Sequence, residues 1–121
     1  MTNAIRNPLE ELTPHEVRDL LKAHRILLVD VREPDEFAVE RIAGALLYPL
    51  STFEASQLPP DDGRPVVFQC GSGKRSAMAA QKRLAAGATK VAHLNGGIGA
   101  WKAAQLPVIS IDPATGKPKS K

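Results

Sequence analysis

The segment Val66-Val67-Phe68-Gln69-Cys70-Gly71-Ser72-Gly73-Lys74-Arg75-Ser76-Ala77 combines three structural patterns in one short run. Residues 66–69 have the pattern of a strand buried on both faces. Two glycines then favour a tight loop, because glycine adopts backbone conformations that other residues resist. From Arg75 to Ala86 the chain is rich in alanine, which predicts a helix that Gly87 can end. Strand, loop and helix in this order indicate one unit of an α/β sheet.

The same alternation extends along the rest of the chain. Apolar strand patterns recur at residues 26–29, 45–48 and 91–94, and helical patterns occur at 13–24, 34–37, 51–57 and 96–104. Thr13 and Glu16 have the spacing of a capping box, with Pro14 at the first helical position. We therefore predict an α/β fold: a central, mainly parallel sheet of about five short strands, with helices on both faces.

Length and composition limit the class of protein. The 121 residues are 43% hydrophobic and 24% charged, typical of one compact domain. We expect a single domain over residues 1–110 and a flexible basic tail over residues 111–121. The longest apolar runs are far shorter than the roughly 20 residues that span a bilayer. Residues 1–11 lack the apolar core of a signal peptide. These features predict a cytoplasmic protein without a membrane partner.

Charge is distributed unevenly around Cys70, the one cysteine of the sequence. Residues 63–111 contain no acidic residue but seven basic ones: Arg64, Lys74, Arg75, Lys82, Arg83, Lys90 and Lys102. A positive field of this kind lowers the pKa of a thiol and attracts anions. Nucleic-acid binding is disfavoured, because aromatic residues make up only 4% of the chain and no recognition motif is present. A single cysteine also excludes an internal disulfide and a multi-cysteine zinc site.

The loop after Cys70 is the candidate site. Gly71 and Gly73 allow successive backbone N–H groups to point inward, and the following helix adds the positive end of its dipole. Both effects favour a thiolate at Cys70 and an anionic substrate beside it. The alternative is that Cys70 is a small buried residue at a strand end and that the glycines only form a turn. The glycine loop, the adjacent Lys74-Arg75 pair and the acid-free surroundings favour the reactive cysteine.

Four segments, in this order along the chain, resemble motifs of the rhodanese-homology family. Residues 30–37 resemble its Asp-Val-Arg-x-x-x-Glu-Phe segment, and residues 41–45 its His-Ile-Pro-Gly-Ala element. Cys70 to Ser76 fits the Cys-x-x-Gly-x-Arg-Ser active loop. Residues 95–108 resemble the closing Gly-Gly-x-x-x-Trp and Leu-Pro-Val elements. The resemblance covers about residues 13–108 and implies a rhodanese fold.

The resemblance also implies a chemistry, the transfer of sulfane sulfur, for which neither a metal nor an organic cofactor is expected. The Cys70 thiolate would take sulfur from a small anionic donor such as thiosulfate and pass it, as a persulfide, to cyanide, a thiol or an acceptor protein. The residues expected to bind the donor or the terminal sulfur are Gly71, Ser72, Gly73, Lys74, Arg75 and Ser76. The Cys-Gly-Ser-Gly opening resembles that of mercaptopyruvate sulfurtransferases, whereas Lys74-Arg75-Ser76 resembles the thiosulfate type, so donor preference stays open.

Two other functions remain as alternatives. The first is a sulfur-relay or protein-interaction module without small-molecule turnover. The second, less favoured, is a phosphatase or arsenate reductase of the same fold, whose loop has five residues between cysteine and arginine; here four separate Cys70 from Arg75. Asp30 and Arg32 follow a predicted strand at the same edge of the sheet, and we expect them to support the loop. His93 lies in a strand pattern and is expected to pack or to face solvent rather than to act as a base.

Overall fold

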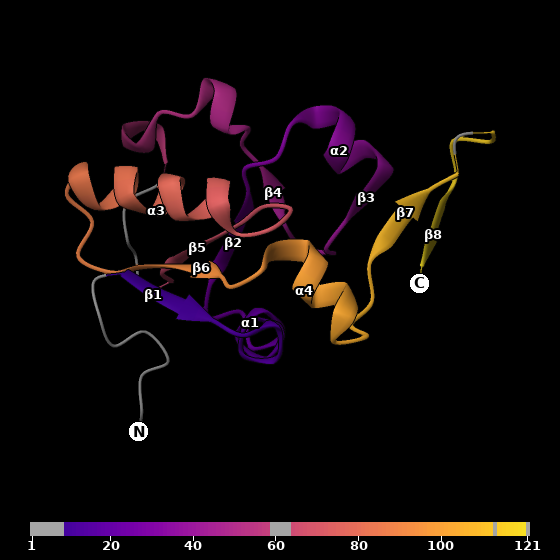
Figure 1. Ribbon diagram of the computed structural model, residues 1–121, viewed down its shortest axis with the longest axis horizontal. Helices are drawn as coiled ribbons and strands as arrows, with labels where there is room; N and C mark the ends of the chain where they lie inside the picture. Colours follow the sequence, from indigo (N-terminus) through magenta and orange to yellow (C-terminus); the bar gives the residue numbers. More distant parts are fainter. Residues whose placement is uncertain (1–8, 59–63, 113, 121) are drawn as a thin grey trace.

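The computed structural model describes residues 9–58, 64–112 and 114–120, and its main feature is a five-stranded sheet (Figure 1). The strand order is β1 (Leu9–Leu12), β6 (Val91–Leu94), β5 (Val66–Gln69), β2 (Leu27–Asp30) and β4 (Leu46–Leu47). Every neighbouring pair is parallel. The predicted α/β fold with a parallel sheet of about five strands is confirmed.

Helices cover both faces of the sheet, and each face has its own apolar cluster. The helices are α1 (Pro14–Lys22), α2 (Pro34–Val39), α3 (Lys74–Ala85) and α4 (Gly97–Ala103), with 3₁₀ turns at Leu50–Thr52 and Ala55–Gln57. Val17 of α1 and Trp101 of α4 pack in one cluster, and Ala80 of α3 packs in the other. Adjacent residues of one strand, such as Val67 and Phe68, face opposite clusters because side chains alternate along a strand.

The predicted start of α1 is confirmed in detail. The Thr13 hydroxyl accepts the Glu16 N–H at 3.2 Å, and the Glu16 carboxylate accepts the Thr13 N–H at 2.9 Å. Pro14 occupies the first turn, where no backbone N–H is needed. The cap ends β1 and turns the chain into α1 directly beside the carboxyl edge of the sheet.

Strand β1 was not predicted from the sequence, and its place in the sheet explains why. Among the described residues it is an edge strand that pairs only with β6, and two of its four residues, Glu10 and Glu11, are acidic. Edge strands carry charged residues that blunt their free side, so the usual apolar signal is weak. Its register sets Glu11 beside His93 of β6.

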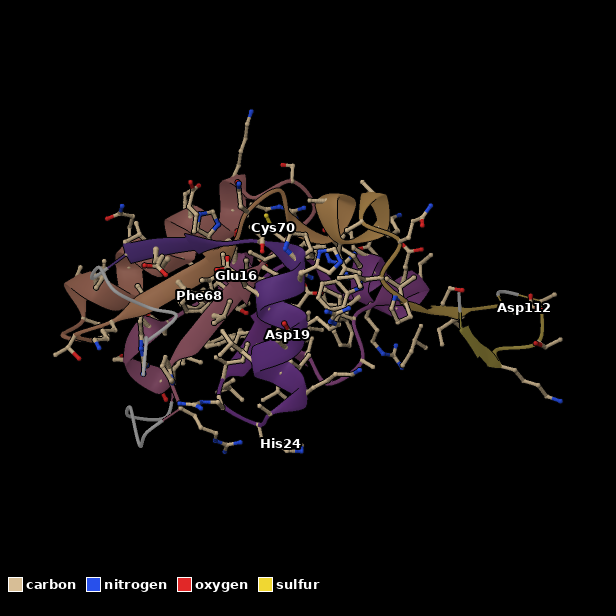
Figure 2. The ribbon with its side chains drawn as sticks, turned by 90° about the horizontal axis from the view of Figure 1, so that it is seen from below. Glu16, Asp19, His24, Phe68, Cys70 and Asp112 are labelled. Atoms are coloured by element: carbon tan, nitrogen blue, oxygen red, sulfur yellow. The ribbon has the colours of Figure 1, made fainter. Side chains whose placement is uncertain are left out.

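The C-terminal residues form strands of a second, smaller sheet. β7 (Ile109–Ile111) pairs antiparallel with β3 (Glu40–Arg41) and with β8 (Pro118–Ser120). This hairpin extends away from the rest of the molecule, with Asp112 far from Cys70 (Figure 2). The division into a domain over residues 1–110 and a flexible tail over residues 111–121 stays a prediction, but the described backbone here has strand geometry.

Asp30 and Arg32 form a buried ion pair at the carboxyl end of β2. Arg32 donates to both carboxylate oxygens, at 2.8 Å from Nη2 and 3.0 Å from Nε, and its backbone N–H donates to the same carboxylate. The side chains are 0% and 5% exposed, and Arg32 also donates to the Glu40 carbonyl at 2.7 Å. The pair therefore ties β2 to the start of β3.

Removal of one partner of this pair is expected to be costly. Asp30→Ala leaves the Arg32 charge buried without compensation, which should lower the free energy of unfolding by about 3–5 kcal/mol. Asp19→Ala, which breaks the exposed Arg18–Asp19 pair, is the matched control and should cost less than about 1 kcal/mol. Urea denaturation of both variants measures the difference. Equal losses would mean that the buried pair contributes no more than a surface one.

Candidate active site around Cys70

The sulfur of Cys70 lies where β5 ends and the loop to α3 begins (Figure 2). The backbone N–H of Gly73 donates to Sγ at 3.1 Å, and that of Ser76 at 3.4 Å. Gly73 has a φ of 103°, in the left-handed region that favours glycine, whereas Gly71 does not have a positive φ. The loop therefore turns at Gly73 and aims its donors at the sulfur.

Opposing effects set the charge of the thiol. Burial of Cys70 raises its pKa, because a low-dielectric environment disfavours the thiolate. Hydrogen bonds from the Ser76 N–H, the Ser76 hydroxyl and the N–H groups of Gly73 and Ser72 outweigh burial, so that the net pKa of Cys70 is lowered. The loop thus stabilises negative charge on a sulfur that solvent does not reach, Cys70 being 0% exposed.

Backbone hydrogen bonds from helix α4 hold the start of the loop after Cys70. The Ile98 N–H donates to the Cys70 carbonyl at 2.8 Å, and the Gly99 N–H donates to the Gly71 carbonyl at 3.1 Å. This contact requires glycine at position 97, where φ is 62° and a Cβ would lie 2.2 Å from the Cys70 carbonyl oxygen. Gly97 at the start of α4 therefore serves the loop, because it lets the two backbones approach.

Arg75 is ion-paired across the loop. Its guanidinium donates to both oxygens of Glu36 in α2, at 2.8 and 3.1 Å, and lies beside Gly71. The hydrogen bond from Arg75 lowers the pKa of Glu36 to about 2, despite an opposing effect of burial. The pKa of Arg75 is raised, and the hydrogen bond to Glu36 is the largest cause. Lys74 and Ser72, two further polar residues predicted to bind substrate, have exposed side chains at the rim.

Ser76 contacts both the sulfur and a histidine. Its hydroxyl lies 3.6 Å from Cys70 Sγ, 3.1 Å from the Gly73 carbonyl oxygen and 2.9 Å from His93 Nδ1. The sequence led us to expect His93 to pack or to face solvent, and it is buried, with a polar contact at each ring nitrogen. Its two hydrogen bonds are to Ser76 and Glu11.

Sequence reasoning did not single out Glu36, Gln69 or Glu11 as parts of the site. Gln69, fully buried beside Cys70, donates from Nε2 to Asp30 and so links β5 to the ion pair of β2. Glu36 lies in a recognisable motif, but nothing in one sequence pairs it with Arg75. Glu11 lies in a stretch without a strand prediction, and its partner follows only once β1 is placed beside β6.

The described residues show neither a metal cluster nor a membrane-spanning helix. No group of three or more His, Cys, Asp or Glu side chains among them is arranged to hold a metal ion. Within the same residues, no helix has the length and apolarity to cross a bilayer.

Comparison with known proteins gives a consistent result. The family model of the rhodanese-like domain matches residues 13–104. An uncharacterized protein of Synechocystis is 42% identical over 98 residues, covering 81% of this chain and 55% of that protein. The thiosulfate sulfurtransferase GlpE of Coxiella burnetii is 31% identical over 94 residues, covering 78% and 88%. The crystal structure of a thiosulfate sulfurtransferase from Pseudomonas aeruginosa matches with a TM-score of 0.74 and 29% identity, covering 83% of this chain and 20% of that one.

The contact between α4 and the loop predicts a sharp effect at Gly97. Gly97→Ala combines backbone strain with a clash against the Cys70 carbonyl, and should lower the free energy of unfolding by about 3 kcal/mol. Gly87→Ala is the matched control, because Gly87 also has a positive φ but a Cβ added there would meet no atom within 4 Å. It should cost about 1 kcal/mol. Chemical denaturation distinguishes them, and equal losses would remove the close approach as the reason for glycine at position 97.

Proposed function

This chain belongs to the rhodanese-like domain family, and we propose that it transfers sulfane sulfur from thiosulfate or a similar anionic donor through a persulfide on Cys70. The observation that carries the proposal is the set of backbone N–H groups aimed at the Cys70 sulfur. These donors favour negative charge at the sulfur before the reaction and on the persulfide after it. A relative and a matched structure that bear the name thiosulfate sulfurtransferase support the donor class.

The reaction has two displacements. The Cys70 thiolate attacks the outer sulfur of thiosulfate, the sulfur–sulfur bond breaks, and sulfite leaves with the bonding electrons. Cyanide or a thiolate then attacks the terminal sulfur, and Cys70 leaves as a thiolate, the form that its N–H donors favour. The sequence has no second cysteine, so the acceptor is an external thiol, cyanide or a partner protein.

The buried position of Cys70 limits the donor. With the residue 0% exposed, the incoming molecule must reach the sulfur through the loop rim, where Ser72 and Lys74 are exposed. A small anion with a terminal sulfur meets this requirement better than a bulky one. Four residues between Cys70 and Arg75 also make a smaller loop than the five expected for phosphoryl or arsenate chemistry.

The persulfide can be tested by mass. After brief exposure to thiosulfate, the intact protein should gain the mass of one sulfur atom, and cyanide should remove it. Cys70→Ser is the matched control and should gain nothing. A gain in mass with mercaptopyruvate but not with thiosulfate would identify mercaptopyruvate, rather than thiosulfate, as the donor. No gain with any sulfur donor, together with Cys70-dependent hydrolysis of para-nitrophenyl phosphate, would contradict the proposal.

The Glu36–Arg75 pair predicts an effect on donor binding. Because the pKa of Glu36 is about 2, its carboxylate stays charged at any ordinary assay pH and opposes an anion beside Arg75. Glu36→Gln removes this charge and should lower the KM for thiosulfate by roughly fivefold, the effect of about 1 kcal/mol on binding. Steady-state cyanide assays measure it.

Glu40→Gln is the control for this substitution. It makes the same change of net charge, but it breaks the pair with Lys102, at 2.7 Å, instead of the pair with Arg75. Its KM should stay close to that of the unaltered protein. A rise in KM in Glu36→Gln would show instead that Glu36 orients Arg75 toward the donor.

A further inference from the structure

A chain of three polar side chains connects the Cys70 sulfur with the protein surface. Ser76 Oγ lies 3.6 Å from Cys70 Sγ and 2.9 Å from His93 Nδ1, and His93 Nε2 lies 3.2 Å from Glu11 Oε2. Ser76 is fully buried and the His93 side chain is 5% exposed, whereas that of Glu11 is 64% exposed. The path therefore begins at a covered thiol and ends at a solvated carboxylate.

The hydrogen-bond capacities of these groups fix a direction. An ionised carboxylate only accepts, so His93 Nε2 carries a hydrogen and donates it to Glu11. In a neutral ring, Nδ1 is then an acceptor for the Ser76 hydroxyl at 2.9 Å, in competition with the Gly73 carbonyl oxygen, to which the same hydroxyl can donate at 3.1 Å. The Ser76 oxygen is left to accept a hydrogen from the Cys70 thiol. When the hydroxyl donates to His93, the shorter of its two contacts, each hydrogen bond in the neutral state points from the sulfur toward Glu11.

The topology brings these groups together from four elements. His93 lies on β6, between Glu11 of β1 and Phe68 of β5 in the parallel register. Ser76 lies in the first turn of α3, which packs over β6 and β5. The other charged groups of that turn face elsewhere: Arg75 is paired with Glu36, and Lys74 is exposed. The charge that His93 meets in its hydrogen bonds is the carboxylate of Glu11.

We propose that His93 is a positioning residue that takes up the proton of the Cys70 thiol through the Ser76 hydroxyl. The thiol proton passes to Ser76 Oγ as the hydroxyl proton passes to His93 Nδ1. The products are a Cys70 thiolate, an intact serine hydroxyl that donates to it, and an imidazolium that Glu11 stabilises. No atom beyond these protons moves, and charge is conserved. The inference deepens the proposed function, because it rests on a thiolate at Cys70 as the nucleophile.

Ultraviolet absorbance of the thiolate tests this without a sulfur donor. The protein has one cysteine, so subtraction of the Cys70→Ser spectrum at each pH isolates its titration. His93→Asn should raise the apparent pKa of Cys70 by about one unit, the low end of the effect of a neighbouring opposite charge. Ser76→Ala should raise it at least as much. In the Ser76→Ala background, His93→Asn should add less than half of its own shift, since the path is already broken.

His24→Asn is the matched control. It makes the same chemical change at an exposed residue, on the opposite side of the molecule from Cys70 in the view of Figure 2, and its φ of 57° suits asparagine. Its Cys70 titration should not shift. Glu11→Gln tests the same path at a largely exposed side chain, so its result does not depend on the folding of variants at the buried residues His93 and Ser76. It should raise the apparent pKa of Cys70 in the same direction, by less than His93→Asn.

The double variant excludes a merely structural role for His93. A general loosening of the site by each substitution would shift the Cys70 titration additively, whereas a shared path makes the two shifts overlap. Fully additive effects of the His93 and Ser76 variants, or an unshifted Cys70 titration in His93→Asn, would overturn the inference. Neither outcome depends on sulfur transfer, so failure here is distinguishable from failure of the persulfide test.

Discussion

The active loop depends on two backbone hydrogen bonds that reach it from α4. The carbonyls of Cys70 and Gly71 accept the N–H groups of Ile98 and Gly99. With the carbonyls directed toward α4, the N–H groups of the following residues can turn toward the sulfur instead. Gly97 makes this approach possible, because any Cβ there would overlap the Cys70 carbonyl. A residue far along the chain thus determines which backbone groups surround the thiol.

The electrostatics of the site follow from how burial and hydrogen bonding oppose each other at Cys70. Burial alone would keep the thiol protonated, and the loop donors reverse that preference. The basic excess of residues 63–111 contributes less than its charge count indicates, because acids from the N-terminal half are paired with part of it. Glu36 pairs with Arg75, and Glu40 with Lys102. Nearby hydrogen bonds, more than net charge, therefore set the state of the sulfur.

The sequence predicts what local patterns encode. Strands β5 and β6, the capping box of α1 and the loop after Cys70 have strong short-range signals, since apolar runs, cap residues and glycines act within a few positions. The shape of the site beyond the loop is not local. The contact of Glu36 with Arg75 and that of Glu11 with His93 join residues separated by 39 and 82 positions. Such pairs depend on strand order and helix placement, which the periodicity of apolar residues along the sequence does not encode.

A different carboxylate lies on each of two sides of Cys70, and this separation avoids electrostatic repulsion at the sulfur. On the side of α2, Glu36 holds Arg75 over Gly71, where an anionic donor would approach. On the side of β1, Glu11 contacts His93, which reaches the thiol only through Ser76. A single carboxylate placed beside the sulfur would oppose both the thiolate and the donor. Two carboxylates, each screened from the sulfur by a positive or proton-carrying group, allow charge near the site without that repulsion.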